Sequence, residues 1–333
     1  MTRPVIALAM FDGLVDHAFT ATHFARLEAA GEVIDHAPLT TFDDDRAAST
    51  LERIDVLVGH WGCPPLTADV LAQAPNLRRF AYAAGTVKWQ VTDAVWERGI
   101  VVTSAAAANA IPVAEYTVAM ILLANKGALI FRERLRDPTT VAALPAYVGN
   151  VDKRVGLVGA SLVGRHVIEL LRPYSLRVAV YDPYLEAAEA RELGVEKVDD
   201  LAALCASVDV LSVHAPDVDA TRGMIGARQL SALRDGAVLI NTARPALVDQ
   251  DALLEHLESG RISAVLDVTT PDPLPADHPL LELANVFVTP HIAGSMGTEL
   301  HRMADLAVDE VERFARGEPP LHPVNRADLE RIA

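Results

Sequence analysis

The chain has 333 residues, of which 51% are hydrophobic and 22% charged, and its formal net charge is -16. This length exceeds what one hydrophobic core usually serves, so two domains are expected. The acidic balance disfavours an electrostatic footprint on nucleic acid or on an anionic membrane. The apolar runs are interrupted before the roughly 20 residues of a membrane span. We therefore predict a cytoplasmic protein without a nucleic-acid or membrane partner.

The first residues and the cysteines set further limits. The opening stretch MTRPVIALAMFDG is a strand-like apolar run followed by a turn, and it lacks the pattern of a secretory signal. Cys63 and Cys205 stand far apart and outside any C-x-x-C pair. Neither a disulfide framework nor a metal site is predicted.

Short apolar strands alternate with helical patterns over the first hundred residues. Strands are predicted at 4–10, 54–60 and 77–84, with helical or turn-rich segments such as 17–32 and 67–76 between them. One small parallel-sheet domain is therefore expected here.

A long apolar helix is predicted next, over 111–136. Pro112 suits its first turn, and Glu115 suits its positive end. Residues 137–153 are interpreted as a loop.

A second α/β series follows the loop. The buried-strand patterns lie at 154–160, 177–183, 208–216, 237–243, 263–269 and 285–291, and a helical pattern covers 297–318. The fold class predicted for the chain is α/β, with two Rossmann-like, doubly wound parallel-sheet domains.

The first strand of this series ends in the stretch VGLVGASLVGR, which is typical of a dinucleotide-binding turn with serine in the middle position. Gly159 is predicted to make the sharp bend, and Gly164 to allow close helix–strand packing, with the phosphates at the helix N-terminus. Ser161 is small enough for the position, and its hydroxyl is expected to donate to a phosphate oxygen. A turn that binds no ligand is the alternative.

Asp182 ends the next strand, 182 − 159 = 23 residues after the first glycine. A carboxylate at about this spacing accepts hydrogen bonds from the adenosine ribose hydroxyls, which favours NAD over NADP. Arg165 or Arg177 would weaken that preference if either reached a 2′-phosphate.

Three polar stretches follow later strands: NTARP, LDVTTPDP and TPHIAGS. Together with ERGIVVTSAAAANAIPVAEYT, VGLVGASLVGR and VHAPDVDATRGMIG, they occur in an order and spacing that resemble the D-isomer-specific 2-hydroxyacid dehydrogenases. The resemblance covers nearly the full length. It implies an oxidoreductase that transfers a hydride between NAD(H) and a D-2-hydroxy acid or its 2-oxo acid.

The resemblance also implies how the chain is organised. Residues 1–107 would begin a substrate domain, 108–293 would form an inserted NAD-binding Rossmann domain, and 294–333 would return to the substrate domain. A homodimer formed through the inserted domain is implied as well.

Three residues receive catalytic roles from the resemblance. Arg244 would bind the substrate carboxylate and His291 would protonate the carbonyl oxygen during reduction. Asp272 stands where the family has glutamate, one methylene longer, so a loop shift or a bridging water is expected between it and the imidazole. Pro245 replaces a family glycine and is expected to hold Arg244 in extended geometry and to divert the following loop.

Further contacts are implied residue by residue. The predicted cofactor-binding residues are Gly159, Ser161, Leu162, Val163, Gly164, Asp182, His214, Ala215, Pro216, Thr242, Ala243, Arg244, Asp267, His291 and Gly294. The predicted substrate-binding residues are Ala84, Gly85, Asn109 and Arg244. Within this set, Asp267 matches the family aspartate that contacts the nicotinamide carboxamide.

Residues 81–90 depart from the family's glycine-rich loop. Lys88 and Trp89 either contact the substrate or are an exposed and a core residue, respectively.

Two other functions remain open on the sequence. One is a non-catalytic, NAD(H)-sensing interaction protein of the same fold, because Ser161, Pro245 and Asp272 depart from the family pattern. The other is a methyltransferase with a Rossmann-like site, which would leave the three polar stretches unexplained.

Overall fold

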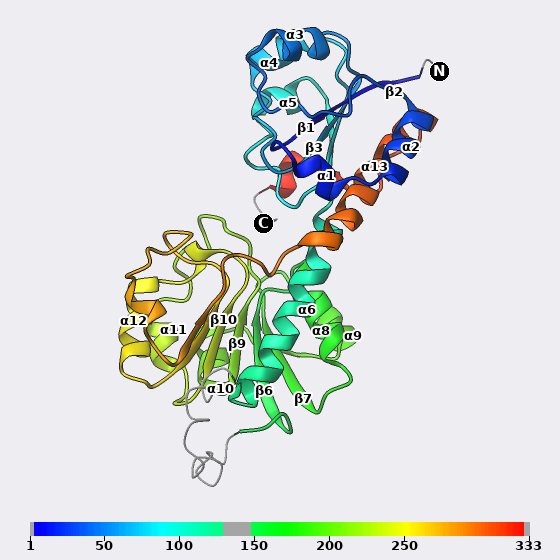
Figure 1. Ribbon diagram of the computed structural model, residues 1–333. Helices are drawn as coiled ribbons and strands as arrows, with labels where there is room; N and C mark the ends of the chain where they lie inside the picture. The colour runs from blue at the N-terminus through cyan, green and yellow to red at the C-terminus, as the bar shows by residue number, and fades with distance from the viewer. Residues whose placement is uncertain (1–2, 129–147, 330–333) are drawn as a thin grey trace. The chain divides into compact units, whose positions relative to one another are not determined.

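The computed structural model describes residues 3–128 and 148–329 (Figure 1). The chain divides into two compact units. Unit 1 consists of residues 1–109 and 295–333, and unit 2 of residues 110–294. The chain therefore passes from unit 1 to unit 2 and back once, and each unit is described by itself below.

Unit 1 is built on a six-stranded sheet whose neighbours are parallel except for one antiparallel pair at the β13 edge. In sheet order the strands are β13 (Pro323–Val324), β5 (Val101–Ser104), β4 (Arg79–Tyr82), β3 (Val56–Gly59), β1 (Val5–Ala9) and β2 (Glu32–Val33). Every residue of β3 and β4 is buried, as expected for parallel strands covered on both faces. The strand order changes direction between β1 and β3.

Helices cover both faces of this sheet. One face packs against α3 (Asp45–Leu51), α4 (Ala68–Gln73) and α5 (Asp93–Glu97). The other packs against α1 (Leu14–Ala18), α2 (Ala21–Ala30) and α13 (Leu300–Arg316), the last preceded by the short turn η5 (Gly297–Glu299). A final turn, η6 (Arg326–Asp328), lies near the end of the described chain. Alternate strand residues feed the two cores: Leu57 belongs to one, and Val56 and Val58 to the other.

Unit 2 is built on a seven-stranded, fully parallel sheet. In sheet order the strands are β12 (Val286–Val288), β11 (Ser263–Leu266), β10 (Val238–Asn241), β9 (Val210–Val213), β6 (Lys153–Val158), β7 (Leu176–Tyr181) and β8 (Glu196–Lys197). The chain builds outward from β6 to β8 and then returns to the other side with β9. The point where the strand order reverses therefore lies between β6 and β9, which is where ligands bind in open sheets of this kind.

Helices also cover both faces of the second sheet, as Figure 1 shows. One face packs against α6 (Ala106–Asn125), α8 (Leu162–Leu171) and α9 (Ala187–Leu193). The other packs against α10 (Leu201–Ser207), α11 (Ala227–Ala232) and α12 (Gln250–Glu258). The short turns η3 (Pro245–Leu247) and η4 (Pro279–Leu281) belong to loops after β10 and before β12. Ser161, Asp200 and Asp249 cap α8, α10 and α12 by accepting a backbone N–H of the first turn.

Helix α6 differs from its prediction. It begins at Ala106, five residues before the predicted start, so Pro112 lies inside the helix and Glu115 lies beyond the first turn. A proline there removes one backbone hydrogen bond, which burial of the helix's apolar side compensates. The predicted residues 129–136 of this helix, and 137–147 of the following loop, lie outside the described residues.

By length and composition alone, α6 is apolar enough to cross a membrane, a test that buried helices of globular domains also pass. In this structure its residues Ala114, Val118 and Ile121 belong to the core of unit 2.

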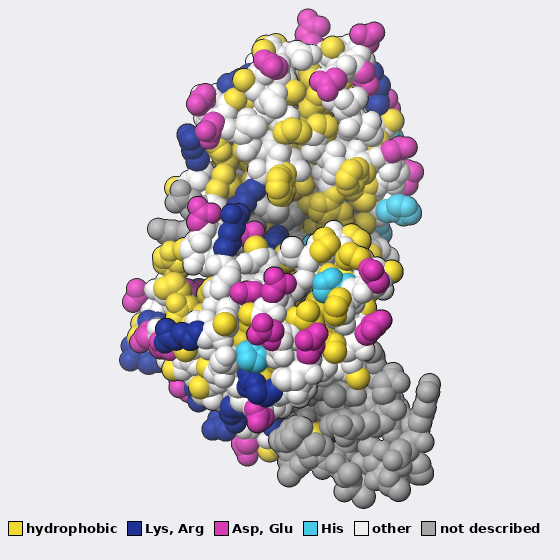
Figure 2. All heavy atoms as spheres, turned by 90° about the vertical axis from the view of Figure 1, so that its left-hand side faces the viewer, with side chains coloured by type: hydrophobic (Ala, Val, Ile, Leu, Met, Phe, Trp, Pro, Cys, Tyr) yellow, Lys and Arg dark blue, Asp and Glu magenta, His cyan; other side chains and the backbone are white. Residues whose placement is uncertain are grey.

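Side chains of both charges are interspersed over the face of the molecule shown in Figure 2. With a formal net charge of -16, the protein as a whole repels anions. An anionic ligand therefore depends on individual cationic groups.

Candidate active site

The turn after β6 requires both of its predicted glycines. Gly159 has φ +105°, and a Cβ atom there would lie 2.8 Å from the backbone nitrogen of Ala215. A Cβ at Gly164 would lie 2.3 Å from the carbonyl oxygen of Gly159. Because the obstructing atoms are backbone, neither glycine can be replaced without moving the turn. Strand β6, this turn and α8 thus pack at the distance that a dinucleotide-binding turn needs.

Ser161 fits the middle position. Its φ of -64° suits any residue, and its hydroxyl oxygen accepts the N–H of Gly164 at 3.4 Å as the N-cap of α8. The hydroxyl hydrogen remains available to donate, so the expected bond to a phosphate oxygen stays a prediction that this geometry allows. Leu162 and Val163 occupy the first helical positions, whose N–H groups have no partner within the helix. The turn therefore fits an anionic pyrophosphate at a helix N-terminus.

Asp182 follows β7 and holds the glycine turn in place. Its Oδ2 accepts the N–H of Ala160 at 2.7 Å, and its Oδ1 accepts the N–H of Tyr184 at 2.8 Å. A carboxylate offers about four acceptor positions, so capacity for ribose hydroxyls remains after these two bonds. The side chain is half-buried at the same edge of the sheet. Asp182 thus has a structural role that its spacing from Gly159 did not reveal.

His214, at the end of β9, is a packing residue. The ring is 4% exposed, and its Nε2 lies 2.9 Å from the Ser212 hydroxyl. Burial lowers the pKa of His214 to about 4, so the ring is neutral near pH 7. The backbone of His214 and Ala215 lies against Gly159 and forms one wall of the turn. Pro216, half-buried, continues this wall.

The turn after β10 is held by a residue that had not been assigned a role. Asn241, 1% exposed, accepts the N–H of Ala243 at 3.1 Å through its Oδ1 and donates from its Nδ2 to the Arg244 carbonyl at 3.0 Å. The hydroxyl of Thr242 lies 2.9 Å from that of Thr117 on α6. The signal for Asn241 in the sequence was a polar side chain at the end of an otherwise apolar strand.

The guanidinium of Arg244 forms no ion pair with a carboxylate in the part of the chain that the structure describes. Its backbone is extended, with φ -143° and ψ 144°, as Pro245 predicts, and Pro245 begins η3. Its guanidinium donates to the carbonyl oxygen of Ala243, at 2.7 Å. Burial lowers the pKa of Arg244 and the nearby Asp217 opposes that shift, yet an arginine stays protonated in proteins. A half-buried guanidinium in this state favours an anionic ligand.

Asp267 anchors the loop that follows β12. The carboxylate is 1% exposed and accepts three hydrogen bonds: from the Thr289 hydroxyl at 2.6 Å, from Ile292 N–H at 2.8 Å and from Ala293 N–H at 2.9 Å. Thr289 in turn accepts from the Tyr116 hydroxyl on α6, at 2.7 Å. The three bonds fix the backbone on both sides of His291. A contact from Asp267 to the nicotinamide remains a prediction.

His291 and Asp272 form a direct pair. The imidazole Nδ1 lies 2.8 Å from Asp272 Oδ2, and the ring is 54% exposed. Because the contact is direct, no bridging water is needed, and the expected loop shift relative to the family stays a prediction. Gln250 holds that loop by bonding both backbone polar groups of Thr270. His291 itself has φ +56°, a left-handed conformation that is uncommon outside glycine.

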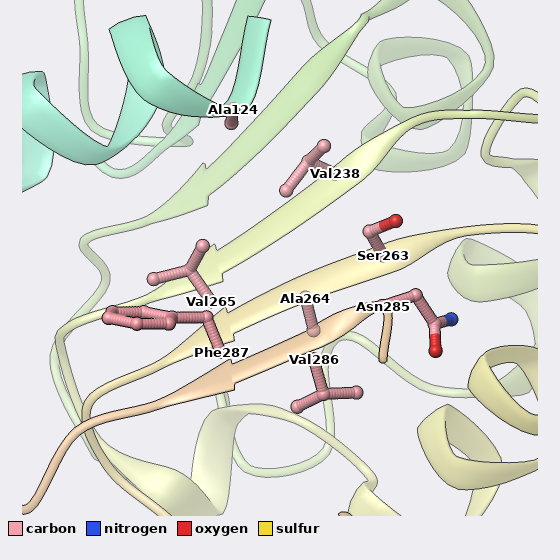
Figure 3. Close-up of a pocket in the computed structure, with 8 residues that line it drawn as sticks. All are labelled: Ala124, Val238, Ser263, Ala264, Val265, Asn285, Val286 and Phe287. Atoms are coloured by element: carbon pink, nitrogen blue, oxygen red, sulfur yellow. The ribbon is translucent and has the colours of Figure 1, made fainter. Parts of the chain in front are cut away.

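The predicted residues thus gather at one edge of the unit 2 sheet. The glycine turn, Arg244, Asp267 and the His291–Asp272 pair all follow the carboxyl ends of its parallel strands, and Gly294 ends the unit. In contrast, a small cavity lies at the amino-terminal ends of β10 to β12, as Figure 3 shows. Its lining is largely apolar: Ala124, Val238, Ser263, Ala264, Val265, Asn285, Val286 and Phe287. That cavity contains none of the predicted site residues.

The predicted substrate residues other than Arg244 lie in unit 1. Ala84 is buried, and a Cβ at Gly85 would stand 3.7 Å from the Asn109 amide nitrogen. Asn109 Oδ1 accepts the N–H of Ser295 at 3.0 Å, which ties together the two points where the chain crosses between units. Trp89 is 81% exposed, so the alternative that placed it in a core was wrong.

Comparison with known proteins identifies the family. Residues 118–293 match the D-isomer specific 2-hydroxyacid dehydrogenase family, NAD binding domain. The chain is 34% identical over 268 residues to glyoxylate reductase of Korarchaeum cryptofilum, covering 79% of this chain and 80% of that protein. It is 31% identical over 308 residues to D-3-phosphoglycerate dehydrogenase of Methanocaldococcus jannaschii, covering 91% of this chain but only 57% of that protein.

The fold is shared with solved structures as well. The holo form of Rhodotorula graminis D-mandelate dehydrogenase superposes with a TM-score of 0.80 over 98% of this chain and 99% of that one, at 24% identity. The protein therefore belongs to the D-isomer-specific 2-hydroxyacid dehydrogenase family. The predicted family, the α/β fold class and NAD as cofactor are confirmed.

Proposed function

We propose that the protein is an NAD-dependent dehydrogenase that interconverts a D-2-hydroxy acid and its 2-oxo acid. The observation behind this proposal is the His291–Asp272 pair at 2.8 Å, placed at the same sheet edge as the glycine turn and the unneutralised Arg244. A proton donor, an anion-binding group and a dinucleotide turn are what hydride transfer to a 2-oxo acid requires. Relatives named for glyoxylate and phosphoglycerate point to the same class of substrate.

Unit 2 would hold the cofactor. The backbone of the turn from Gly159 to Gly164 and the first N–H groups of α8 would bind the pyrophosphate, and Asp182 would bind the adenosine ribose. Asp267 and the backbone at Thr242 and Ala243 would border the nicotinamide. When bound, NADH supplies the hydride. All other chemistry below belongs to side chains of this chain.

Arg244 would bind the substrate carboxylate. Its planar fork donates two parallel hydrogen bonds to a carboxylate, which fixes the orientation of the acid as well as its position. The same charge would polarise the adjacent 2-oxo group. The extended backbone at Pro245 and the two bonds from Asn241 hold the turn from which this side chain projects.

His291 would deliver the proton. Asp272 accepts from Nδ1, which leaves Nε2 as the atom that donates to the carbonyl oxygen during reduction and accepts the hydroxyl proton during oxidation. The carboxylate also stabilises the imidazolium form needed for reduction. Asp267 fixes the backbone around His291 and so determines where the ring points.

The remaining assignments extend the same proposal. Residues 1–107 and 294–333 would form the substrate domain and 108–293 the NAD-binding domain, with Ala84, Gly85 and Asn109 contacting substrate. A cytoplasmic homodimer completes the proposal. A non-catalytic NAD(H) sensor is less favoured, because such a protein has no use for an imidazole–carboxylate pair beside an unneutralised arginine.

The test is NADH oxidation against 2-oxo acids graded by size and charge, from glyoxylate to aromatic acids. We expect reduction of at least one acid, with NADH binding measured separately by fluorescence. If NADH binds and no acid in the series is reduced, the sensor function replaces the enzyme. If NADH does not bind, the proposed cofactor site is wrong.

A further inference from the structure

A cluster of four residues lies where the glycine turn meets the end of β7. Asp182 accepts the N–H of Ala160, and Arg165 donates from its Nε to the carbonyl of the same residue at 2.9 Å. The guanidinium of Arg165 also bonds Glu189 on α9 at 2.7 Å. The backbone of one residue, Ala160, thus joins the proposed ribose-binding carboxylate to Arg165, and Glu189 binds that arginine in turn.

The ion pair contributes little to stability. The Arg165 and Glu189 side chains are 40% and 39% exposed, and water screens an ion pair exposed to this degree. Its main effect is on the charge available to a ligand. Glu189 neutralises the arginine that shares Ala160 with Asp182, so the cluster presents one net negative charge to the ribose.

We propose that Glu189 sets the preference for NAD over NADP by keeping Arg165 from a 2′-phosphate. This inference rests on the proposed cofactor site. A 2′-phosphate brings about two negative charges and needs a cation that is free to turn toward it. In this chain the guanidinium donates to Glu189 and to a backbone carbonyl instead, while Asp182 and Glu189 both repel the phosphate. Arg177, the other arginine named from the sequence, lies near the start of β7, at the opposite end of that strand from Asp182, and donates to the Asp152 carbonyl.

The experiment compares Glu189→Gln with Glu186→Gln. Glu186 lies on the same helix at its N-cap, is exposed and makes no side-chain cap, so its substitution removes the same charge without releasing Arg165. Dissociation constants for NADP⁺ and NAD⁺ are measured by titration calorimetry. Glu189→Gln is expected to tighten NADP⁺ binding about fivefold, the size of one exposed ion pair, with NAD⁺ binding within about twofold of wild type. Glu186→Gln should change neither.

A double variant assigns the gain to the arginine. Adding Arg165→Ala to Glu189→Gln is expected to abolish the improvement for NADP⁺. The gain should also shrink as salt rises, because it is electrostatic. The inference is overturned if Glu189→Gln leaves NADP⁺ binding unchanged, if Glu186→Gln tightens it equally, or if the gain survives loss of Arg165. Failure of the wild type to bind NAD⁺ would instead overturn the proposed function itself.

Discussion

The two sheets differ in the atoms that surround the glycines at the points where their strand orders reverse. In unit 2, the space beside Gly159 and Gly164 is filled by backbone, from Ala215 and from Gly159 itself. In unit 1, Gly62 follows β3 with φ +84°, and the space beside it is filled by a single residue, Phe11: a Cβ there would lie 2.3 Å from Cδ1 of its ring and 2.6 Å from its backbone nitrogen. Phe11 is 63% exposed, and its N–H bonds the Trp61 carbonyl at 2.8 Å.

The difference shows that two sheets with similar strand arrangements can carry different residues at the ends of their strands. Glycines packed on backbone allow a helix N-terminus to approach the strand ends, which suits a phosphate. In unit 1, Gly62 packs against Phe11, so an exposed aromatic side chain borders that strand edge. Both sheets reverse their strand order, and they differ in the residues that follow the strands at that point.

The largest effect is expected from His291→Ala. If the reaction occurs at the unit 2 edge, this change removes the proton donor and lowers 2-oxo acid reduction about 10²- to 10⁴-fold, the usual range for a general acid. The ring is 54% exposed, so the fold should persist. NADH affinity, measured by fluorescence, serves as the control and should stay near wild type. A variant that keeps its activity would remove His291 from the mechanism.

The second prediction sets Gly159→Ala against Gly62→Ala. Both add a methyl group at positive φ, but only Gly159 lies in the proposed phosphate turn. Backbone strain of about 2 kcal/mol predicts roughly 30-fold weaker NADH binding for Gly159→Ala. Gly62→Ala should displace the Phe11 ring and leave NADH affinity unchanged. Equal losses of affinity in the two variants would contradict the contrast between the strand edges.

These positions also show what the sequence can and cannot predict. Gly159, Gly164 and Asp182 were found because strand, turn and helix are continuous in the chain. Asn241 and Glu189 were missed, because their roles depend on partners that only the fold brings close. The choice between a loop shift and a bridging water at Asp272 was left open for a related reason: side-chain length can be compared in a sequence, whereas the hydrogen bonds by which Gln250 holds the loop cannot.

The start of helix α6 is a second case in which the sequence alone was not sufficient. Pro112 was placed in a first turn because proline favours that position, but the helix begins earlier, at Ala106. Local preference was overridden by burial against the unit 2 sheet. The positions of the strands were predicted better than the start of this helix, because buried parallel strands can be recognised as short apolar runs.

A smaller effect is expected from Asp272→Asn. The variant keeps an acceptor for Nδ1 and loses the charge that favours imidazolium, so kcat/KM for 2-oxo acid reduction should fall about tenfold. NADH affinity should stay near that of the wild type. An unchanged kcat/KM would show that Asp272 does not act on His291.

The last comparison concerns one buried histidine in each unit. His60, fully buried after β3, accepts the Trp61 N–H at 2.7 Å, and His214 pairs with Ser212. Burial lowers the pKa of both from 6.5 to about 4. The unfolded chain therefore binds protons that the folded chain rejects, so stability is complete above pH 6.5 and is lost as the pH falls toward 4.

Each histidine should contribute about 3 kcal/mol to this loss, and substitution of either should reduce it. His60→Asn keeps an acceptor for the Trp61 N–H, and His214→Gln keeps a polar partner for Ser212. Urea unfolding near neutral pH and near pH 4 is expected to show a smaller acid loss in each variant than in wild type. If only His214→Gln reduces the loss, folding does not lower the pKa of His60. Water would then reach the His60 ring, which would bind its proton equally well in the folded and the unfolded chain.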